Sequence, residues 1–152
     1  MSRTFKIATL DNASRAQAFP LLRATWPDLD LEDWLAFADR FANSGDTSTG
    51  LVGLRDDSGA LCGLFVYRIG HTLRDERILS IPLFTAMDLA NSLEPVRALL
   101  NAVKDRAELC DCLRLRIELA SEQTGLANRL HRLGTSRCGM VHSIELRESA
   151  DR

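Results

Sequence analysis

The sequence predicts one α/β domain in which a single mixed, mostly antiparallel sheet is flanked by helices. The chain has 152 residues, which is the size of one ordinary domain. Its composition, with 45% hydrophobic and 26% charged residues, is close to the globular average and argues against a disordered chain. The hydrophobic period also switches between two and 3.6 residues, as strands and helices require. The predicted order is β-α-α-β-β-β-α-β-α-β.

The N-terminal part of the chain is predicted to form a strand and two helices. Residues 4–10 alternate polar and apolar side chains, which suits a half-buried strand. The helical stretch 14–26 contains Pro20, so we expect it either to kink there or to restart with Pro20 in its first turn. Asp30 is the expected N-cap of the second helix. One face of that helix carries Leu31, Trp34, Leu35, Ala38 and Phe41.

The middle of the chain is predicted to be a meander of three consecutive strands. Residues 51–55 and 60–69 flank a turn with Gly59, which is typical of a β-hairpin. A second turn leads into the apolar run 76–87. Pro82 lies inside this run and cannot donate to a ladder, so we expect it at a bulge or at a strand edge.

The C-terminal part is predicted to form two helices and two strands. Ser92 is the expected N-cap of a long amphipathic helix, and the strictly alternating segment 113–119 follows as a strand. A shorter helix over 124–133 is closed by a glycine, and a last strand is predicted over 139–147. Residues 1–147 would then form a single domain, with 148–152 as a frayed tail.

Charge and composition exclude several classes of partner. The net charge of −2 gives no bulk reason to expect nucleic acid or an anionic membrane, and no apolar run reaches the roughly 18 residues of a membrane span. The N-terminus lacks the apolar segment of a secretory signal, so we expect a cytoplasmic protein with reduced cysteines. The short last strand would leave a sheet edge that a second subunit could cover, as in a homodimer.

Three tracts resemble one known family. Residues 54–63 form a hairpin with a turn glycine, 98–107 form a central helix, and 130–134 lead into a strand ending at 144–146. Together with the order of elements, they resemble the GCN5-related N-acetyltransferases over nearly the whole chain. The resemblance implies an acyl-CoA N-acyltransferase-like fold and transfer of an acetyl group from acetyl-CoA, or another acyl-CoA, to an unidentified amine of a small molecule or peptide. The alternative is a catalytically inactive ligand-binding or protein-interaction module.

The family's pyrophosphate-binding motif is degenerate in this chain. In that motif a basic or amide residue precedes closely spaced glycines at the N-terminus of the central helix. Its first position falls on Asn91, and its glycine positions fall on Ser92, Glu94 and Val96. At about 4 Å and an effective dielectric near 20, the Glu94 carboxylate would repel a phosphate by about 4 kcal/mol, and rotation into solvent would reduce this. The residues that the resemblance places against the cofactor are Ala86, Met87, Asn91, Ser92, Val96 and Arg97.

The acid and base that acetyl transfer needs have weak candidates in the sequence. The family's tyrosine that protonates the departing thiolate falls on Leu130, which can donate nothing, and its neighbour His131 could serve if the register differs by one residue. Glu76 is the first candidate for the general base, and His71 and Asp88 are alternatives. The competing interpretation of all three base candidates is a solvated turn residue.

Two further groups of residues have an ordinary and a functional interpretation. Three cysteines and one histidine match the ligand count of a zinc site, but their C-x-C spacing is unusual, so we expect reduced thiols and no metal. These residues are Cys110, Cys112, Cys138 and His142. Arg114 and Arg116 alternate along one strand and could reach a phosphate, although the solvated face of a strand is the favoured interpretation.

Overall fold

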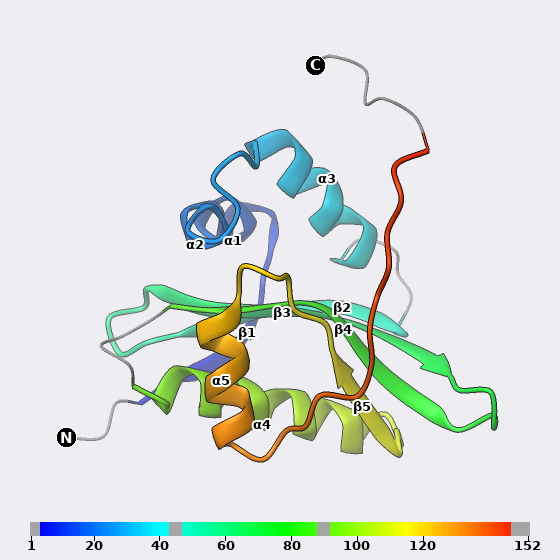
Figure 1. The fold of residues 1–152 in the computed structure, drawn as a ribbon. Coiled ribbons are helices and arrows are strands. Elements are labelled where there is room, and N and C mark those ends of the chain that lie inside the picture. Colours follow the sequence, from blue (N-terminus) through cyan, green and yellow to red (C-terminus); the bar gives the residue numbers. More distant parts are fainter. Residues whose placement is uncertain (1–3, 43–46, 88–91, 147–152) are drawn as a thin grey trace.

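The sheet has five strands in the spatial order β1-β2-β3-β4-β5, with helices on both of its faces (Figure 1). In this computed structural model, residues 4–42, 47–87 and 92–146 are described. Neighbouring strands pair antiparallel from β1 to β4, whereas β4 and β5 pair parallel. The predicted mixed, mostly antiparallel sheet is thus confirmed.

The elements follow one another as β-α-α-α-β-β-β-α-β-α. The strands are β1 (Lys6–Thr9), β2 (Thr49–Arg55), β3 (Leu61–His71), β4 (Arg77–Ala86) and β5 (Arg114–Ile117). The helices are α1 (Asn12–Gln17), α2 (Phe19–Arg23), α3 (Leu31–Ala42), α4 (Glu94–Leu109) and α5 (Thr124–Arg132). No helix among the described residues combines the length and the apolar character that crossing a membrane requires.

Local signals place the N-terminal helices. The Asp11 carboxylate accepts the Ser14 N–H at 2.8 Å and caps α1, and this hydrogen bond holds the pKa of Asp11 below its usual value. Pro20 lies in the first turn of α2, so the helical stretch restarts there, which was one of the two expected outcomes. Asp30 accepts the Asp33 N–H at 2.8 Å at the start of α3, as predicted.

Two hydrophobic clusters hold the helices to opposite faces of the sheet. On one face, α1, α2 and α3 pack on side chains of β2 and β3, with Trp34 and Leu64 buried between them. On the other face, the stripe of α4 that includes Leu99 and Val103 packs on β3 and β4, and Leu126 and α5 join the same cluster. Figure 1 shows α1–α3 above the sheet and α4 and α5 below it.

Tyr67, the single tyrosine, is a core residue that lies across a glycine. It pairs with Gly50 of β2, packs beside Phe65 and has the Arg106 guanidinium over its ring at 5.2 Å. A Cβ at Gly50 would lie 2.3 Å from Tyr67 Cε1. Because the ring is held on two sides, it cannot move away cheaply. The glycine is therefore needed for close approach of the ring.

Replacing Gly50 with alanine is expected to lower the free energy of unfolding by about 1–3 kcal/mol, the usual cost of overpacking. Chemical denaturation measures this change. Gly70→Ala is the matched control in β3, because its nearest neighbour would be Ile78 Cγ2 at 3.9 Å, an ordinary contact. If both substitutions had the same small effect, the packing of Tyr67 on Gly50 would not be the reason for the glycine.

The predicted last strand over 139–147 is wrong for the residues described. Residues 135–146 form no helix or strand, and residues 136–146 are exposed. The period-two pattern is present, but a strand also needs a neighbour, and no strand among the described residues pairs with this segment or with the outer edge of β5. In Figure 1 the segment leaves the lower end of α5, crosses the level of the sheet in this view and continues upward toward the C-terminus. Residues 147–152, with the predicted frayed tail, lie outside the described residues.

Candidate active site

The two parallel strands β4 and β5 separate partway along their length. Their ladder joins Ile78–Ile81 to Arg114–Ile117, and the Glu118 N–H donates to the Ile81 carbonyl at 2.9 Å. The next residue of β4 is Pro82, which has no N–H to continue the ladder. The strands therefore diverge after this point, and no strand among the described residues pairs with the main-chain groups that β4 turns to that side.

Pro82 also lies at a bulge, as its position in the sequence predicted. Val66 of β3 pairs with Leu83, whereas Arg68 pairs with Ser80, so β4 has one more residue than β3 between these pairs. The extra residue falls at Ile81–Pro82. A bulge bends the strand and re-aims its side chains, and here it lies where β4 leaves β5.

Gln123 bridges the split with its buried side-chain amide. Its Nε2 donates to the Phe84 carbonyl of β4 at 2.9 Å, and its Oε1 accepts the Ala120 N–H at 2.8 Å, beyond the end of β5. The side chain thus replaces the direct hydrogen bond that the separated strands cannot form. It fixes the width of the split, because both of its polar groups are used.

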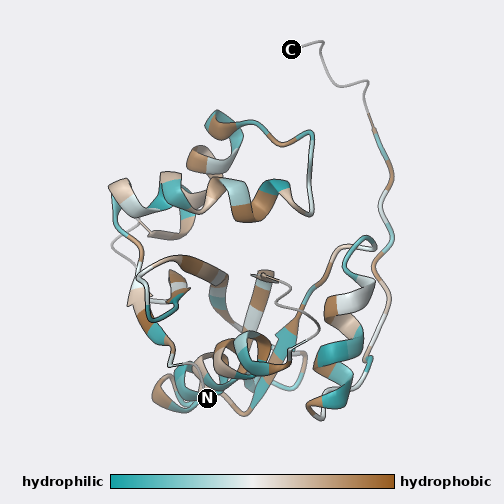
Figure 2. Ribbon diagram, turned by 90° about the vertical axis from the view of Figure 1, so that its left-hand side faces the viewer, coloured by the Kyte–Doolittle hydropathy of each residue, from teal (hydrophilic) through white to brown (hydrophobic). Residues whose placement is uncertain are grey.

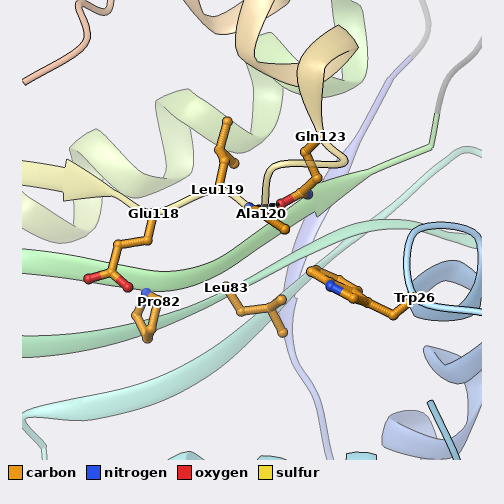
Figure 3. Close-up of a pocket in the computed structure, with 7 residues that line it drawn as sticks. All are labelled: Trp26, Pro82, Leu83, Glu118, Leu119, Ala120 and Gln123. Carbon is orange, nitrogen blue, oxygen red and sulfur yellow. Dashed lines mark hydrogen bonds between the residues drawn. The ribbon is translucent and has the colours of Figure 1, made fainter. Parts of the chain in front are cut away.

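A pocket of about 220 Å³ lies at the split (Figure 3). Its walls come from the α2–α3 connection, from β4 and from the segment after β5. Figure 3 shows Trp26 at one end of the pocket and Glu118 at the other, with Leu83 directed between them. The lining residues are Trp26, Pro82, Leu83, Glu118, Leu119, Ala120 and Gln123.

Main-chain groups of β4 face this split. The Met87 N–H donates to Cys62 of β3 at 2.7 Å, so the alternate residues Leu83 and Thr85 also turn their main chain toward β3. Phe84 and Ala86 turn theirs to the opposite side, as the bond from Gln123 to the Phe84 carbonyl requires. An extended ligand in the split would therefore meet the N–H groups of Phe84 and Ala86.

Glu118 supplies a carboxylate to the pocket wall. The residue is exposed, and among the residues described here no cationic side chain lies within salt-bridge distance of it. By contrast, Glu76, the first base candidate in the sequence, is paired with Arg114. An unpaired carboxylate beside an apolar pocket can accept a proton or hold an ammonium group.

The N-terminus of α4 offers few main-chain donors. The Glu94 N–H donates to Ser92 Oγ at 3.2 Å, Pro95 has no N–H, and the Arg97 N–H donates to the Leu93 carbonyl at 2.8 Å. The N-cap of α4 is Leu93, one residue after the predicted Ser92. Val96 is buried, while Glu94 and Arg97 are exposed, so the Glu94 carboxylate lies in solvent. Asn91 lies outside the described residues.

The sequence candidates for the base lie at the far end of β4. Glu76 accepts the Arg114 guanidinium Nε at 2.9 Å. It precedes Leu83 by seven residues, which corresponds to roughly 20 Å along a strand. His71 is exposed at the end of β3, near Glu76 in the turn between the strands. Neither lines the pocket, and Asp88 lies outside the described residues.

The candidate acid also lies away from the pocket. His131 is exposed near the end of α5, and its Nδ1 is 3.2 Å from the Thr135 carbonyl oxygen. Eight residues separate it from Gln123, which corresponds to about 12 Å along a helix. Leu130, on which the resemblance places the family's tyrosine, is a buried core residue with 3% exposure.

The cysteines do not gather into a metal centre within the described part of the chain. No group of three or more histidine, cysteine, aspartate or glutamate side chains there could hold a metal ion. Cys112 is partly buried, and this burial, with the nearby Cys110, raises the pKa of its thiol. A raised pKa keeps the thiol protonated, which makes it a poor metal ligand and a poor nucleophile.

The fold defined by this split sheet and its two helical layers is that of the N-acetyltransferases. Solved structures of such enzymes align over nearly the whole chain. Glucosamine-6-phosphate N-acetyltransferase from Arabidopsis thaliana has a TM-score of 0.70 and 13% identity, covering 95% of this chain and 99% of its own. The aminoglycoside N-acetyltransferase AAC(6')-Iy in complex with CoA has a TM-score of 0.75 and 14% identity, covering 97% of each chain.

The similarity is one of fold. A transcriptional regulator from Bacillus halodurans C-125 aligns with a TM-score of 0.75 and 11% identity, over 94% of this chain and 100% of its own. No family model matches the sequence, and no curated protein matches it. Because one fold can carry different functions, the reaction has to be argued from the site.

Sequence reasoning missed the residues that build the pocket. The sequence patterns single out none of Glu118, Gln123 and Trp26 as a site residue. Only Pro82 gave a usable signal for the site, because a proline inside an apolar strand has no N–H and interrupts the hydrogen bonds to the neighbouring strand. The split itself depends on the pairing of β4 with β5, whose paired residues lie 36 positions further along the chain, and no local pattern contains this pairing.

Proposed function

We propose that this protein is an acyl-CoA-dependent N-acetyltransferase that transfers an acetyl group from acetyl-CoA to an amine of a small molecule or peptide. The observation that carries the proposal is the split between β4 and β5, with its pocket and the unpaired main-chain edge of β4. In the reaction, the amine nitrogen would form a bond to the thioester carbonyl carbon as the carbon–sulfur bond breaks.

The residues at the split fit the thioester arm of acetyl-CoA. That arm is extended and carries amide groups, so it can pair with a strand edge as a further strand would. The N–H groups of Phe84 and Ala86 face that side, and Ala86 is one of the residues that the family resemblance places against the cofactor. The apolar wall of Leu83 and Leu119 would surround the acetyl group.

The fit to the pyrophosphate is weaker. Of the first-turn amides of α4, one is used by Ser92 and one is absent at Pro95, and the exposed Glu94 carboxylate repels an anion. Val96 and Arg97 remain proposed contacts, and the Arg97 side chain is the cation nearest in sequence to Glu94. We therefore propose binding of acetyl-CoA with an affinity lower than a glycine-rich loop would give.

Glu118 is the residue that we propose as general base. Its carboxylate lies in the pocket wall, where it would take the proton of the attacking amine directly or through one water molecule. Glu76 and His131, the predicted base and acid, remain proposals with less support, because the first is paired with Arg114 and neither lines the pocket. We also propose that the protein acts in the cytoplasm, with its thiols reduced.

A non-catalytic binding module is the second candidate. Two observations favour it: the buried Leu130 cannot donate a proton to a departing thiolate, and the N-terminus of α4 has few donors for a phosphate. Such a module would bind acyl-CoA or another extended ligand in the split, yet release no thiol with any amine. Measurement of free thiol separates the two candidates.

Calorimetric titration with acetyl-CoA tests the proposed function. We expect saturable binding, and we expect Glu94→Gln to tighten it by roughly three- to thirty-fold at low salt, since the variant removes one solvent-screened repulsion. Glu108→Gln is the matched control, because Glu108 is exposed at the other end of α4. Absence of heat and of a thermal shift with acetyl-CoA and propionyl-CoA at millimolar concentration would refute the proposal.

A further inference from the structure

Three polar residues form a row across β3, β4 and β5. Arg68 of β3 pairs with Ser80 of β4, and Ser80 pairs with Arg116 of β5. Residues that pair in neighbouring strands project from the same face of a sheet. The Cα atoms of the two arginines are two strand spacings apart, roughly 10 Å, so both side chains can close on one anion. The Ser80 hydroxyl lies between them as a third donor.

The arginine row lies on the face of the sheet that carries α1–α3. Side chains alternate along a strand, and the residues on either side of each member of the row pack in the opposite cluster. These neighbours are Tyr67 and Ile69, Leu79 and Ile81, and Leu115 and Ile117. Figure 1 shows the hairpin between β3 and β4 extending beyond α1–α3, and Figure 2 shows α4 on the other side of the sheet. Both arginines are accordingly exposed, and Ser80 is half-buried.

The arginine row is next to the pocket along both of its outer strands. In β3, Val66 precedes Arg68 by two residues on the same face, and it pairs with Leu83 of the pocket wall. In β5, Arg116 precedes Glu118 by two residues, which is about 6.6 Å along a strand. The Glu118 N–H continues the ladder to β4, so alternation places its side chain on the face of Arg116. The row therefore adjoins the Glu118 end of the pocket.

Opposite charges thus lie side by side here without pairing. In the part of the chain that the structure describes, neither Arg68 nor Arg116 has a carboxylate within salt-bridge distance, whereas Arg114 is paired with Glu76 at 2.9 Å. Glu118 has no cationic partner there either. An arginine binds a carboxylate or phosphate through parallel N–H groups, and a carboxylate binds an ammonium group. A ligand that carries both charges would satisfy all three side chains.

We propose that the acceptor is a small zwitterion, an amine that also carries a carboxylate or a phosphate, and that Arg68 and Arg116 bind its anionic group while Glu118 faces its amine. The inference rests on the proposed function and names the substrate class of the same site. The ammonium group first gives one proton to water, and the free amine attacks the thioester carbon. The nitrogen gives a second proton to Glu118 as the carbon–sulfur bond breaks, and the departing thiolate takes a proton from solvent.

The arginine row is better placed for the acceptor than for the phosphates of acetyl-CoA. The N–H groups proposed for the thioester arm belong to Phe84 and Ala86, and α4, with the proposed phosphate contacts, follows later in the chain. Ser80, in the middle of the row, lies six residues before Ala86, which corresponds to roughly 20 Å along a strand. The thioester arm would therefore lie between the row and the phosphates.

Matched pairs of amines test the acceptor class. γ-Aminobutyrate is compared with n-butylamine, and O-phosphoethanolamine with ethanolamine, so that one pair reports a carboxylate and the other a phosphate. Release of the CoA thiol gives kcat/KM for each amine. We expect the acidic member of at least one pair to be favoured by roughly ten-fold or more, as for hydrogen bonds to a charged group. Equal constants within both pairs would overturn the inference and leave the proposed function standing.

The double variant Arg68→Gln/Arg116→Gln tests the two arginines. We expect it to lower kcat/KM for the favoured acid by about five- to fifty-fold, chiefly through KM, because the lost contacts are partly screened by solvent. Arg74→Gln is the matched control, because Arg74 is an exposed arginine in the turn between β3 and β4, and it should keep the preference. If the double variant weakened binding of acetyl-CoA and kept the preference for the acid, the arginines would hold a cofactor phosphate and the inference would be wrong.

Calorimetric titration with γ-aminobutyrate and with O-phosphoethanolamine, each in the absence and presence of CoA, separates this inference from the proposed function. We expect at least one of the two acids to bind the wild-type chain at millimolar concentration, and we expect the double variant to lose that heat. If the acid bound in this way but no amine released thiol, acetyl transfer would fail and the zwitterion site would stand. Absence of heat with both acids would overturn the inference, whatever acetyl-CoA does.

Discussion

Gln123→Leu is expected to lower the free energy of unfolding by about 2–4 kcal/mol, because it leaves one buried carbonyl and one partly buried N–H without partners at about 1–3 kcal/mol each. These groups are the Phe84 carbonyl and the Ala120 N–H, which the Gln123 amide now joins. Leucine has a similar volume, so the loss comes from hydrogen bonding rather than from a cavity. Urea denaturation followed by circular dichroism measures it.

Two further variants show whether the loss of stability comes from the two hydrogen bonds of the Gln123 side chain. Gln17→Leu is the matched control, because Gln17 is exposed in α1 and its 3.3 Å contact with Arg55 lies at the surface. It should change stability by less than about 0.5 kcal/mol. Gln123→Glu keeps the acceptor for Ala120 but at neutral pH places a buried carboxylate oxygen against the Phe84 carbonyl, so it should destabilise the fold at least as much as Gln123→Leu. Equal losses for Gln17→Leu and Gln123→Leu would contradict the bridge.

The bridge also connects stability to the site. If Gln123 sets the separation of β4 and the segment after β5, its loss changes the pocket that Leu83 and Leu119 line. We therefore expect Gln123→Leu to weaken binding of acetyl-CoA as well as to destabilise the fold. A binding constant that stayed the same in a destabilised variant would assign the amide a purely structural role.

Elements with a strong internal signal could be predicted from the sequence. The start of α3 follows from Asp30, because a carboxylate before an apolar periodic run satisfies a free helical N–H. The bulge at Pro82 follows from the missing N–H of proline. In each case the physical cause acts within a few residues, so the sequence contains it.

Features that depend on a distant partner could not be predicted in this way. The alternation over 139–147 predicts a strand, but a strand also needs a neighbour, and no strand among the described residues pairs with this segment. Glu118 alternates with Arg114 and Arg116 along the sequence. It lines the pocket only because β4 and β5 separate beside it. The candidate site was therefore predicted at the strand β4 but not at the residues that face it.

Glu118→Gln is expected to reduce the rate of amine acetylation by about 10²–10⁴-fold, the usual contribution of a positioned general base. Glutamine has nearly the same shape as glutamate, so the walls of the pocket should persist. Release of the CoA thiol with any amine that the wild-type protein accepts measures the rate. Glu122→Gln is the matched control, because Glu122 is an exposed glutamate four residues away that does not line the pocket.

The two kinetic constants separate the roles that this carboxylate could have. A base acts in the transition state, so Glu118→Gln should lower kcat and leave the affinity for acetyl-CoA unchanged. A carboxylate that only holds a cationic acceptor contributes equally to the bound substrate and the transition state, so its loss should raise KM for the amine with kcat preserved. If neither constant changed, Glu118 would be a solvated residue at the mouth of the split, and the base would have to be sought elsewhere.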